Sequence, residues 1–293
     1  MRINKKWFFA AILLVIAAIV IGGCARSQQN AVQIKGSDTM SPLSQAWAEE
    51  FRKTHPNIDI AVTGGGSGVG IAALENGTTD IAMSSRSVTK EELDAVKAKG
   101  NDPKEFQVAS DGIVVIVNPS NPVSKLTIAQ LSRIFTGEIT NWKDVGGANA
   151  QIVLLSRDKN SGTHLFFLEH VVRESDKNSK KQFAAFAQLF VSNQPIAQQV
   201  ETNKNAIGYV GLGYFEPNKH KAIAVAKTPA GPYVMPSETT VLSNDYPISR
   251  KLFYYTPKPP AGAVKEFIDY TLNPEGQKLV EKVGFVPIKR AKG

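Results

Sequence analysis

The sequence predicts an α/β fold, because short β-rich runs alternate with segments of helical length along most of the chain. Three times within residues 32–99 a strand leads into a polar loop that opens a helix. Residues 112–117 form a continuous apolar run, which is typical of a strand buried on both faces. A second α/β unit begins near residue 118, so the prediction is of two units rather than one.

The first unit begins with a strand at residues 32–35 and a polar loop at residues 36–41. Pro42 suits the first turn of the helix that follows, residues 42–53, since the missing N–H has no partner at that position. The apolar side chains of this segment recur at helical spacing and predict one buried face.

Two more strand–loop–helix units follow. A strand at residues 58–62 leads into the glycine loop 64–70 and a short helix, and a buried strand at 80–83 leads into the loop 84–87. Thr89-Lys90-Glu91-Glu92 is a capping box that opens the next helix. Ligands of open α/β sheets bind beyond the carboxyl ends of the strands, so we expect these loops to converge.

The second half of the chain repeats the alternation. It contains an amphipathic helix at residues 126–135 and a strand at 151–155 that delivers Arg157. Near the C-terminus residues 251–255 predict a strand, and two helices follow after Pro260 and Pro274.

The N-terminus is a targeting segment rather than part of the fold. A basic stretch precedes fifteen apolar residues from Trp7 to Ile21, fewer than the roughly twenty that a membrane span needs. The junction Ile21-Gly22-Gly23-Cys24 resembles a bacterial lipobox. Residues 1–23 are therefore predicted to be a lipoprotein signal peptide, and residues 24–30 a lipidated tether. Cys24 would carry the acyl chains, such as palmitate, that anchor the protein on the extracytoplasmic face of the cell membrane.

Composition excludes several other classes of protein. Residues 24–293 are long enough for two domains, and removal of the targeting segment reduces the formal charge from +8 to +5. The lysines are scattered among acidic residues, which argues against nucleic-acid binding. Cys24 is the only cysteine, so no intramolecular disulfide forms. The four histidines lack metal-ligand spacing, and we expect neither a metal nor a cofactor.

Residues 157–164 are the most informative segment for function. A cation, two hydroxyls and a glycine stand at the predicted start of an apolar helix, where backbone N–H groups lack internal partners. Arg157, Ser161 and Thr163 are thus placed to bind a small oxyanion. Taken alone, the segment favours an ordinary N-cap beside a solvated arginine, because serine and threonine caps are common.

The glycine loop 64–70 is not a nucleotide-binding loop. Ile71-Ala72 follows Gly70 where an NTPase would carry Lys-Ser/Thr, and Val69 stands where a dinucleotide-binding loop has its third glycine. What remains is a helix start with one hydroxyl, Ser67, for which anion binding and a tight turn are equally good interpretations. No serine–histidine or metal arrangement for catalysis is evident, so the protein is predicted not to be an enzyme.

Several motifs together resemble the phosphate-binding protein of bacterial phosphate ABC importers. They are Gly36 to Leu43, the Ser67 loop, Asp80 to Arg86, Leu131 to Trp142, Arg157 to Thr163 and Asn273 to Gln277, in the family's order. The resemblance covers essentially the whole mature chain. It implies a two-lobed class II periplasmic-binding-protein fold, with a hinge of two chain crossings, that closes on phosphate and delivers it to a membrane permease.

The resemblance also implies a set of ligand residues. The predicted phosphate-binding residues are Ser37, Asp38, Thr39, Met40, Ser67, Ser85, Arg86, Arg157, Ser161, Gly162 and Thr163.

One position departs from the family pattern. Many members have an aspartate where this chain has Ser85, and that carboxylate accepts the proton of phosphate and so rejects sulfate. Asp38 is a candidate for the missing acceptor, although a loop cap is an equally good interpretation of it. Asp158 is the reserve candidate, expected instead to orient Arg157, and Arg86 either adds charge to the site or reaches solvent.

The predicted organisation assigns residues 31–117 and 243–293 to the first lobe and residues 118–242 to the second. The hinge is expected near Asn118 and Ser243. The predicted protein is a monomer that captures inorganic phosphate outside the cytoplasm and docks on ABC permease subunits. The alternatives are a binding protein for another tetrahedral oxyanion, a phosphate sensor and, less favoured, an envelope phosphatase.

Overall fold

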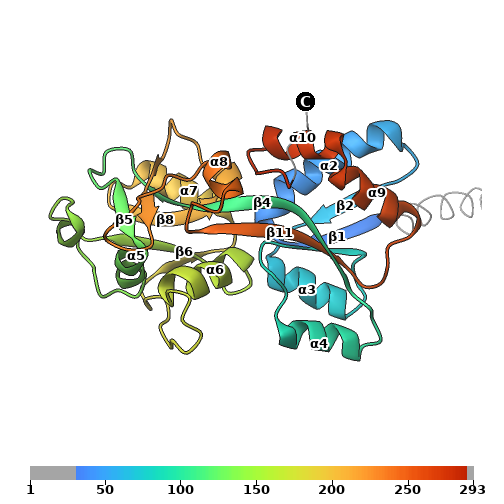
Figure 1. Ribbon diagram of the computed structural model, residues 1–293, viewed down its shortest axis with the longest axis horizontal. Coiled ribbons are helices and arrows are strands. Elements are labelled where there is room, and N and C mark those ends of the chain that lie inside the picture. The colour runs from blue at the N-terminus through green and yellow to red at the C-terminus, as the bar shows by residue number, and fades with distance from the viewer. Residues whose placement is uncertain (1–30, 289–293) are drawn as a thin grey trace, which may run out of the picture.

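The computed structural model describes residues 31–288, which form two lobes side by side (Figure 1). The predicted signal peptide and Cys24 lie outside these residues. Among the helices of residues 31–288, none combines the length and the apolar character that crossing a membrane requires.

A single long sheet runs through both lobes. Its strand order is β2-β1-β3-β11-β4-β8-β6-β7, with β9 paired to β4. The first three of these strands lie in one lobe and the last three in the other, with β11 and β4 between them. The mixed α/β fold class is therefore confirmed, and each lobe has a parallel group of strands: β1 with β2 and β3, and β6 with β7 and β8.

The first lobe packs helices on both faces of its half of the sheet. One face carries a core that includes Ile34, Trp47 and Phe267, and the other a smaller cluster around Leu74 and Val96. The elements of this lobe are β1 (Val32–Gly36), η1 (Asp38–Met40), α2 (Ser41–Thr54), β2 (Ile60–Thr63), α3 (Ser67–Glu75), β3 (Ile81–Ser84), α4 (Lys90–Ala98), α9 (Gly262–Leu272) and α10 (Pro274–Lys282).

The second lobe is built in the same way. Its larger core includes Phe135, Trp142 and Phe167, and a second cluster around Ile196 and Val210 covers the opposite face. Its elements are β5 (Lys125–Thr127), α5 (Ile128–Phe135), η2 (Trp142–Val145), β6 (Val153–Arg157), α6 (Gly162–Phe167), η3 (Leu168–Val172), β7 (Gln188–Phe190), α7 (Asn193–Thr202), β8 (Ala206–Gly211), η4 (Leu212–Tyr214), β9 (Lys221–Ala222), β10 (Ala224–Ala226) and α8 (Glu238–Leu242).

Two long antiparallel strands, β4 (Lys104–Val117) and β11 (Ser249–Thr256), join the lobes (Figure 1). Ala109 and Leu252 pack in the core of the first lobe, whereas Ile113 and Ile248 pack in that of the second. The chain thus crosses from the core of one lobe to the core of the other within these two strands. This packing favours a hinge a few residues from the predicted positions, Asn118 and Ser243, and the lobe limits stay a prediction.

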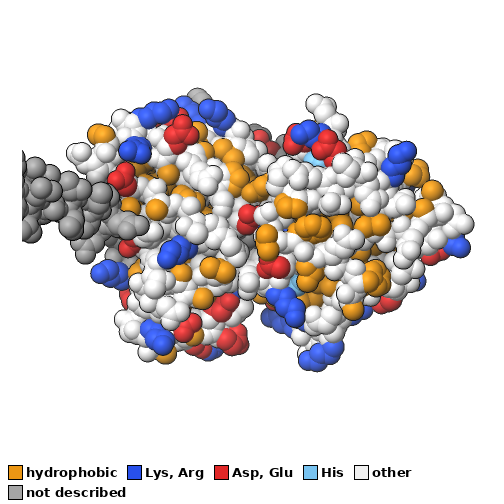
Figure 2. Space-filling view, turned by 180° about the vertical axis from the view of Figure 1, so that it is seen from behind, with side chains coloured by type: hydrophobic (Ala, Val, Ile, Leu, Met, Phe, Trp, Pro, Cys, Tyr) orange, Lys and Arg blue, Asp and Glu red, His pale blue; other side chains and the backbone are white. Residues whose placement is uncertain are grey.

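Charged side chains of both signs are dispersed over the two lobes. Figure 2 shows Lys and Arg side chains interspersed with Asp and Glu on one face of the molecule. Several of them form exposed pairs, such as Lys90 with Asp94. Dispersed charges and exposed ion pairs of this kind are typical of a surface that faces solvent.

Candidate functional site

The candidate site lies where the carboxyl ends of the parallel strands of both lobes face each other. In the first lobe β1 leads into η1, β2 into α3, and β3 into the loop at Ser85. In the second lobe β6 leads into α6 and β7 into α7. Ligand loops of α/β sheets gather at this edge, and here the loops of the first lobe contact those of the second directly.

Four buried hydroxyls form the centre of the cluster. Thr39 Oγ1 of the first lobe lies 3.0 Å from Thr163 Oγ1 of the second. Ser67 Oγ lies 3.3 Å from Ser85 Oγ and accepts the Ser85 backbone N–H at 3.1 Å. All four residues are at most 1% exposed, so the hydroxyls are held in place by their surroundings.

Arg157 supplies the positive charge of the cluster. Its Nε and Nη2 donate to the carbonyl oxygens of Phe190 at 3.3 Å and Val191 at 2.8 Å. Nη2 also lies 3.4 Å from Asp38 Oδ2, whereas Nη1 is buried without a hydrogen-bond partner among residues 31–288. Burial lowers the pKa of the Arg157 guanidinium, and the Asp38 carboxylate opposes that shift. A buried donor without a partner is costly, which makes an acceptor at Nη1 favourable.

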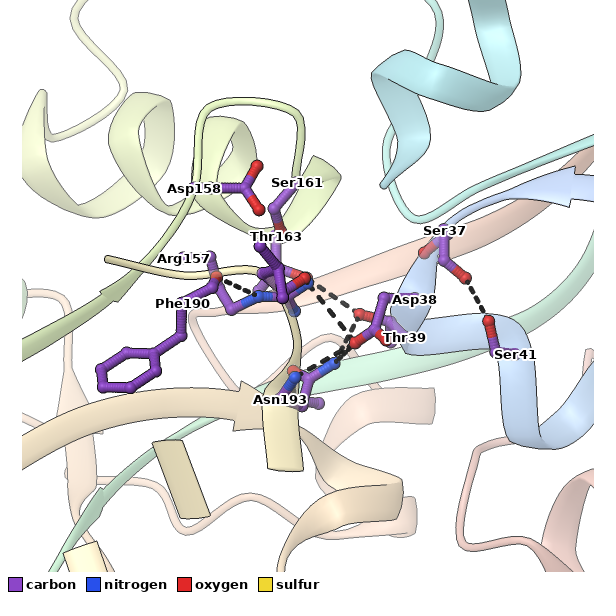
Figure 3. A network of polar contacts seen from close by, with 12 residues as sticks. Ser37, Asp38, Thr39, Ser41, Arg157, Asp158, Ser161, Thr163, Phe190 and Asn193 are labelled. Atoms are coloured by element: carbon purple, nitrogen blue, oxygen red, sulfur yellow. Dashed lines mark hydrogen bonds and ion pairs between the residues drawn. The ribbon is translucent and has the colours of Figure 1, made fainter. Parts of the chain in front are cut away.

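Asp38 forms cross-lobe contacts rather than a cap. Its Oδ2 accepts from Asn193 N at 3.1 Å and Asn193 Nδ2 at 2.9 Å, and faces the Arg157 guanidinium (Figure 3). Tyr214 Oη donates to the Asp38 carbonyl oxygen at 2.9 Å. The side-chain contacts of Asp38 use Oδ2, so Oδ1 takes part in none of them.

The lobes touch directly beside the cluster. A Cβ added to Gly162 of the second lobe would lie 2.2 Å from Ser67 Oγ and 2.8 Å from Ser85 Oγ of the first. The Gly68 N–H donates to the Asn160 carbonyl oxygen at 3.1 Å. A larger residue at Gly162 would therefore fit only if Ser67 and Ser85 shifted.

The start of α6 is organised by its own residues. Ser161 Oγ accepts the His164 backbone N–H at 3.3 Å, which is an N-cap contact. The His164 ring donates through Nδ1 to the Arg157 carbonyl oxygen at 2.7 Å, and burial lowers the pKa of the imidazole. Nδ1 is thus engaged by the backbone, and no hydrogen bond joins the His164 ring to the Ser161 hydroxyl among residues 31–288.

Three expectations from the sequence, for Arg86, Met40 and Asp158, need correction. Arg86 is bound to both carboxylate oxygens of Glu92, at 2.7 and 2.6 Å, and so does not reach the cluster. The role of Ser37 stays a prediction; its carbonyl oxygen accepts from Ser41 Oγ (Figure 3). The Met40 N–H donates to that same Ser37 carbonyl oxygen at 3.1 Å.

The third correction concerns Asp158, which was expected to orient Arg157. Its Oδ1 accepts the Asn160 N–H at 2.7 Å and so fixes the turn before α6. Asp38, from the other lobe, makes the ion pair with Arg157 instead.

Three residues of the cluster were not predicted: Asn193, Arg250 and Asp111. Arg250 Nη1 donates to Thr163 Oγ1 at 2.9 Å, and Nε and Nη2 both bind Asp111 Oδ2, at 2.9 and 2.7 Å. The sequence contained a signal for two of them: Asp111 and Arg250 each adjoin an apolar strand, at Asp111-Gly112 and Arg250-Lys251. A charge at such a position is buried and needs a partner. No comparable signal marks Asn193.

The cluster is rich in hydrogen-bond donors, and each of its two carboxylates, Asp38 and Asp111, lies against an arginine. Hydroxyls from four loops and the free Nη1 of Arg157 all point to an acceptor ligand of small size. Within residues 31–288, no group of three or more His, Cys, Asp or Glu residues is arranged to hold a metal ion.

Comparison with known proteins gives a consistent result. A family model described as a PBP superfamily domain matches residues 24–275. The protein SphX of Synechococcus elongatus is 36% identical, over 95% of this chain and 85% of its own length. The phosphate-binding protein PstS of Staphylococcus haemolyticus is 31% identical, over 96% of this chain and 92% of its own length.

Solved structures agree with these relatives. A putative phosphate ABC transporter substrate-binding protein of Clostridium perfringens, with bound phosphate, has a TM-score of 0.78 and is 33% identical, covering 89% of this chain and 100% of that one. An ABC-type phosphate transport receptor of Vibrio cholerae has a TM-score of 0.71 and is 31% identical, covering 87% of this chain and 99% of that one. The two-lobed fold predicted from the sequence is confirmed.

Proposed function

We propose that this chain, which belongs to the family of bacterial phosphate-binding proteins, captures inorganic phosphate outside the cytoplasm and delivers it to an ABC-type permease. The proposed ligand residues are Asp38, Thr39, Ser67, Ser85, Arg157, Ser161, Gly162 and Thr163. The role is that of a monomeric binding protein without catalysis. The related proteins of known structure are substrate-binding proteins of phosphate transporters, which supports this role.

The observation that carries the proposal is the buried Nη1 of Arg157. Its guanidinium is 1% exposed, and the other two nitrogens are already bound. A phosphate oxygen at Nη1 would complete the set of hydrogen bonds and balance the charge. Thr39 of the first lobe contacts Thr163 of the second, so an anion bound beside this pair would be held where the two lobes meet.

Contact with both lobes also explains how binding would be coupled to closure. A ligand stabilises the closed arrangement only by the affinity it gains there over the open one. Donors on a single lobe would bind phosphate equally well in both states. Because the donors come from both, opening would break part of the set, and the ligand therefore favours closure about the strands β4 and β11.

Wild-type protein should melt at a higher temperature in the presence of inorganic phosphate, because a ligand that binds only the folded state stabilises it. At one hundred times the dissociation constant the gain is about 2.7 kcal/mol. Differential scanning fluorimetry measures the shift. The same protein should release no p-nitrophenol from p-nitrophenyl phosphate, and hydrolysis would favour an envelope phosphatase instead. An equal shift with sulfate would favour a general oxyanion-binding protein.

Discrimination between phosphate and sulfate is expected to depend on Asp38. Ser85 can donate to either anion, and so an acceptor must come from elsewhere in the cluster. The Asp38→Asn protein should lose phosphate affinity and gain relative affinity for sulfate, since a carboxylate accepts the phosphate proton and repels an anion that has none. Competition calorimetry with both anions measures the ratio.

Asp158→Asn is the matched control for this experiment. Asp158 is close to the site, but its carboxylate binds the Asn160 N–H. It should therefore leave the ratio of the two affinities near that of the wild type. A change of ratio in Asp158→Asn alone would transfer the acceptor role to Asp158.

Membrane attachment is a separate part of the proposal. We infer that Cys24 is lipidated after removal of residues 1–23 and that residues 24–30 tether the protein. The short apolar run before the Gly22-Gly23-Cys24 junction and the start of the family match at residue 24 support this. The Cys24→Ala protein should appear in the soluble fraction or remain unprocessed. Cell fractionation with an antibody measures this, and a processed protein still bound to the membrane would contradict it.

A further inference from the structure

Arg250 lies behind the proposed ligand residues and touches three of them. Its Nη1 donates to Thr163 Oγ1 at 2.9 Å and to the Ser85 carbonyl oxygen at 3.2 Å. Its Nη2 lies 3.4 Å from Thr39 Oγ1. The side chain is 1% exposed and stands on β11, close to the point where the chain passes between the lobes. One buried guanidinium thus contacts loops of both lobes.

The hydrogen bonds of Thr39 determine the direction of its hydroxyl. A hydroxyl oxygen accepts through two lone pairs and donates one proton. Thr39 Oγ1 accepts from Arg250 Nη2 at 3.4 Å and from Asn193 Nδ2 at 3.4 Å, so both lone pairs are engaged. Either oxygen could donate in the contact between Thr39 and Thr163, and the two contacts that Thr39 accepts favour Thr39 as the donor.

The same reasoning gives the hydrogen-bond direction of the Thr163 hydroxyl. Its oxygen accepts from Arg250 Nη1 at 2.9 Å and from Thr39 at 3.0 Å, which again fills both lone pairs. The remaining proton of Thr163 is then directed to a third group. A hydroxyl that accepts from a charged donor is also a stronger donor itself, because hydrogen bonds in a chain polarise one another.

Asp111 keeps the Arg250 guanidinium in this position. Its Oδ2 binds Nε and Nη2 of Arg250, while Oδ1 accepts the Leu212 N–H at 2.9 Å. Asp111 is fully buried, so the two charges compensate each other away from water. Arg250 consequently contributes oriented donors to the site rather than net charge.

We propose that Arg250 is a positioning residue for anion binding. It donates to Thr39 and Thr163 and so occupies acceptor positions of both hydroxyls. The Thr163 hydroxyl can then only donate, and it donates to an unprotonated oxygen of the ligand. The inference rests on the proposed phosphate-binding function. It assigns the protonated oxygen of the ligand to another side of the site, away from Thr163.

The test is a double-mutant cycle measured with inorganic phosphate by calorimetry. Arg250→Met with Asp111→Leu removes both buried charges, which is often tolerated when apolar residues of similar volume replace a pair. Thr39→Val with Thr163→Val removes the two hydroxyls at nearly constant volume. Each pair of substitutions should lower phosphate affinity at least about tenfold, since hydrogen bonds to charged groups are lost or weakened.

The combined variant distinguishes positioning from a structural effect. If Arg250 acts through the two hydroxyls, the combination should bind within about threefold of the Thr39→Val/Thr163→Val protein, because sites in one network are not additive. Losses that multiply, or normal binding by Arg250→Met/Asp111→Leu, would overturn the role of Arg250. Absence of phosphate binding by wild-type protein would instead overturn the proposed function.

Arg250→Lys provides a second route if the apolar pair does not fold. Lysine keeps the charge beside Asp111, but its single ammonium lacks the planar fork that reaches both threonines. The same cycle applies, with circular dichroism and melting without phosphate as checks of the fold. Arg250→Lys should show the same coupled loss, and wild-type affinity in this variant would overturn the proposal.

Discussion

Arg157→Ala is expected to lower phosphate affinity by about a hundredfold or more, because charge-assisted hydrogen bonds in a dehydrated site contribute a few kcal/mol. The fold should persist. Arg157 Nη1 is buried without a hydrogen-bond partner among residues 31–288, so removal of the guanidinium relieves a desolvation cost, although its contact with Asp38 is lost. Calorimetric titration and circular dichroism measure the two effects.

Two further variants make this result specific. Arg133→Ala removes an arginine of the same lobe that is 55% exposed and paired with Glu138, and it should bind phosphate normally. Arg157→Lys keeps the charge but not the three nitrogens, so it should recover only part of the affinity. Binding by Arg157→Ala within threefold of the wild type would exclude Arg157 from the site.

Local patterns predicted much of the first lobe. Helix α2 was expected at residues 42–53 and spans Ser41–Thr54, and the capping box at Thr89 and Glu92 is present with both of its hydrogen bonds. These features depend on near neighbours in the chain. The strand predicted at residues 112–117 is instead the last part of β4, which spans Lys104–Val117. The first part of β4 is only half-buried and contains polar residues, so only the last part is continuously apolar.

The loops that carry the site were also predictable, since the carboxyl ends of parallel strands share one edge of a sheet. What each side chain does there was not. Asp38 binds Asn193, which is 155 residues away in the chain, and Thr39 approaches Thr163 of the other lobe. Such contacts depend on how two lobes meet, and no periodicity along the chain contains that information. Arg86 is the opposite case, because its ion-pair partner is local. Its guanidinium pairs with Glu92, the capping-box glutamate that is close to it in the sequence.

The close approach of the lobes leads to the second large effect. Gly162 belongs to the second lobe, and the atoms that an added Cβ would meet, Ser67 Oγ at 2.2 Å and Ser85 Oγ at 2.8 Å, belong to the first. Both serines are buried and bonded to each other, so neither can move aside freely. Alanine favours a helix more than glycine does, so the second lobe itself should not be weakened.

Gly162→Ala is therefore expected to act on closure rather than on folding. Overpacking of a fitted contact typically costs about 1–3 kcal/mol, which corresponds to a loss of roughly tenfold to a hundredfold in phosphate affinity. The melting temperature without phosphate should stay the same or rise slightly, while the shift produced by phosphate should shrink. Calorimetry gives the affinity, and small-angle scattering with saturating phosphate reports whether the lobes still close.

Gly68→Ala is the matched control. Gly68 also stands in the first turn of a helix and faces the other lobe, but an added Cβ would lie 3.5 Å from the Asn160 carbonyl oxygen, at ordinary contact distance. Its backbone N–H would still donate to that oxygen. Gly68→Ala should bind phosphate within a few-fold of the wild type. Equal affinities for the two alanine variants would mean that phosphate binding does not require the lobes to approach as closely as Gly162 and Ser67 do.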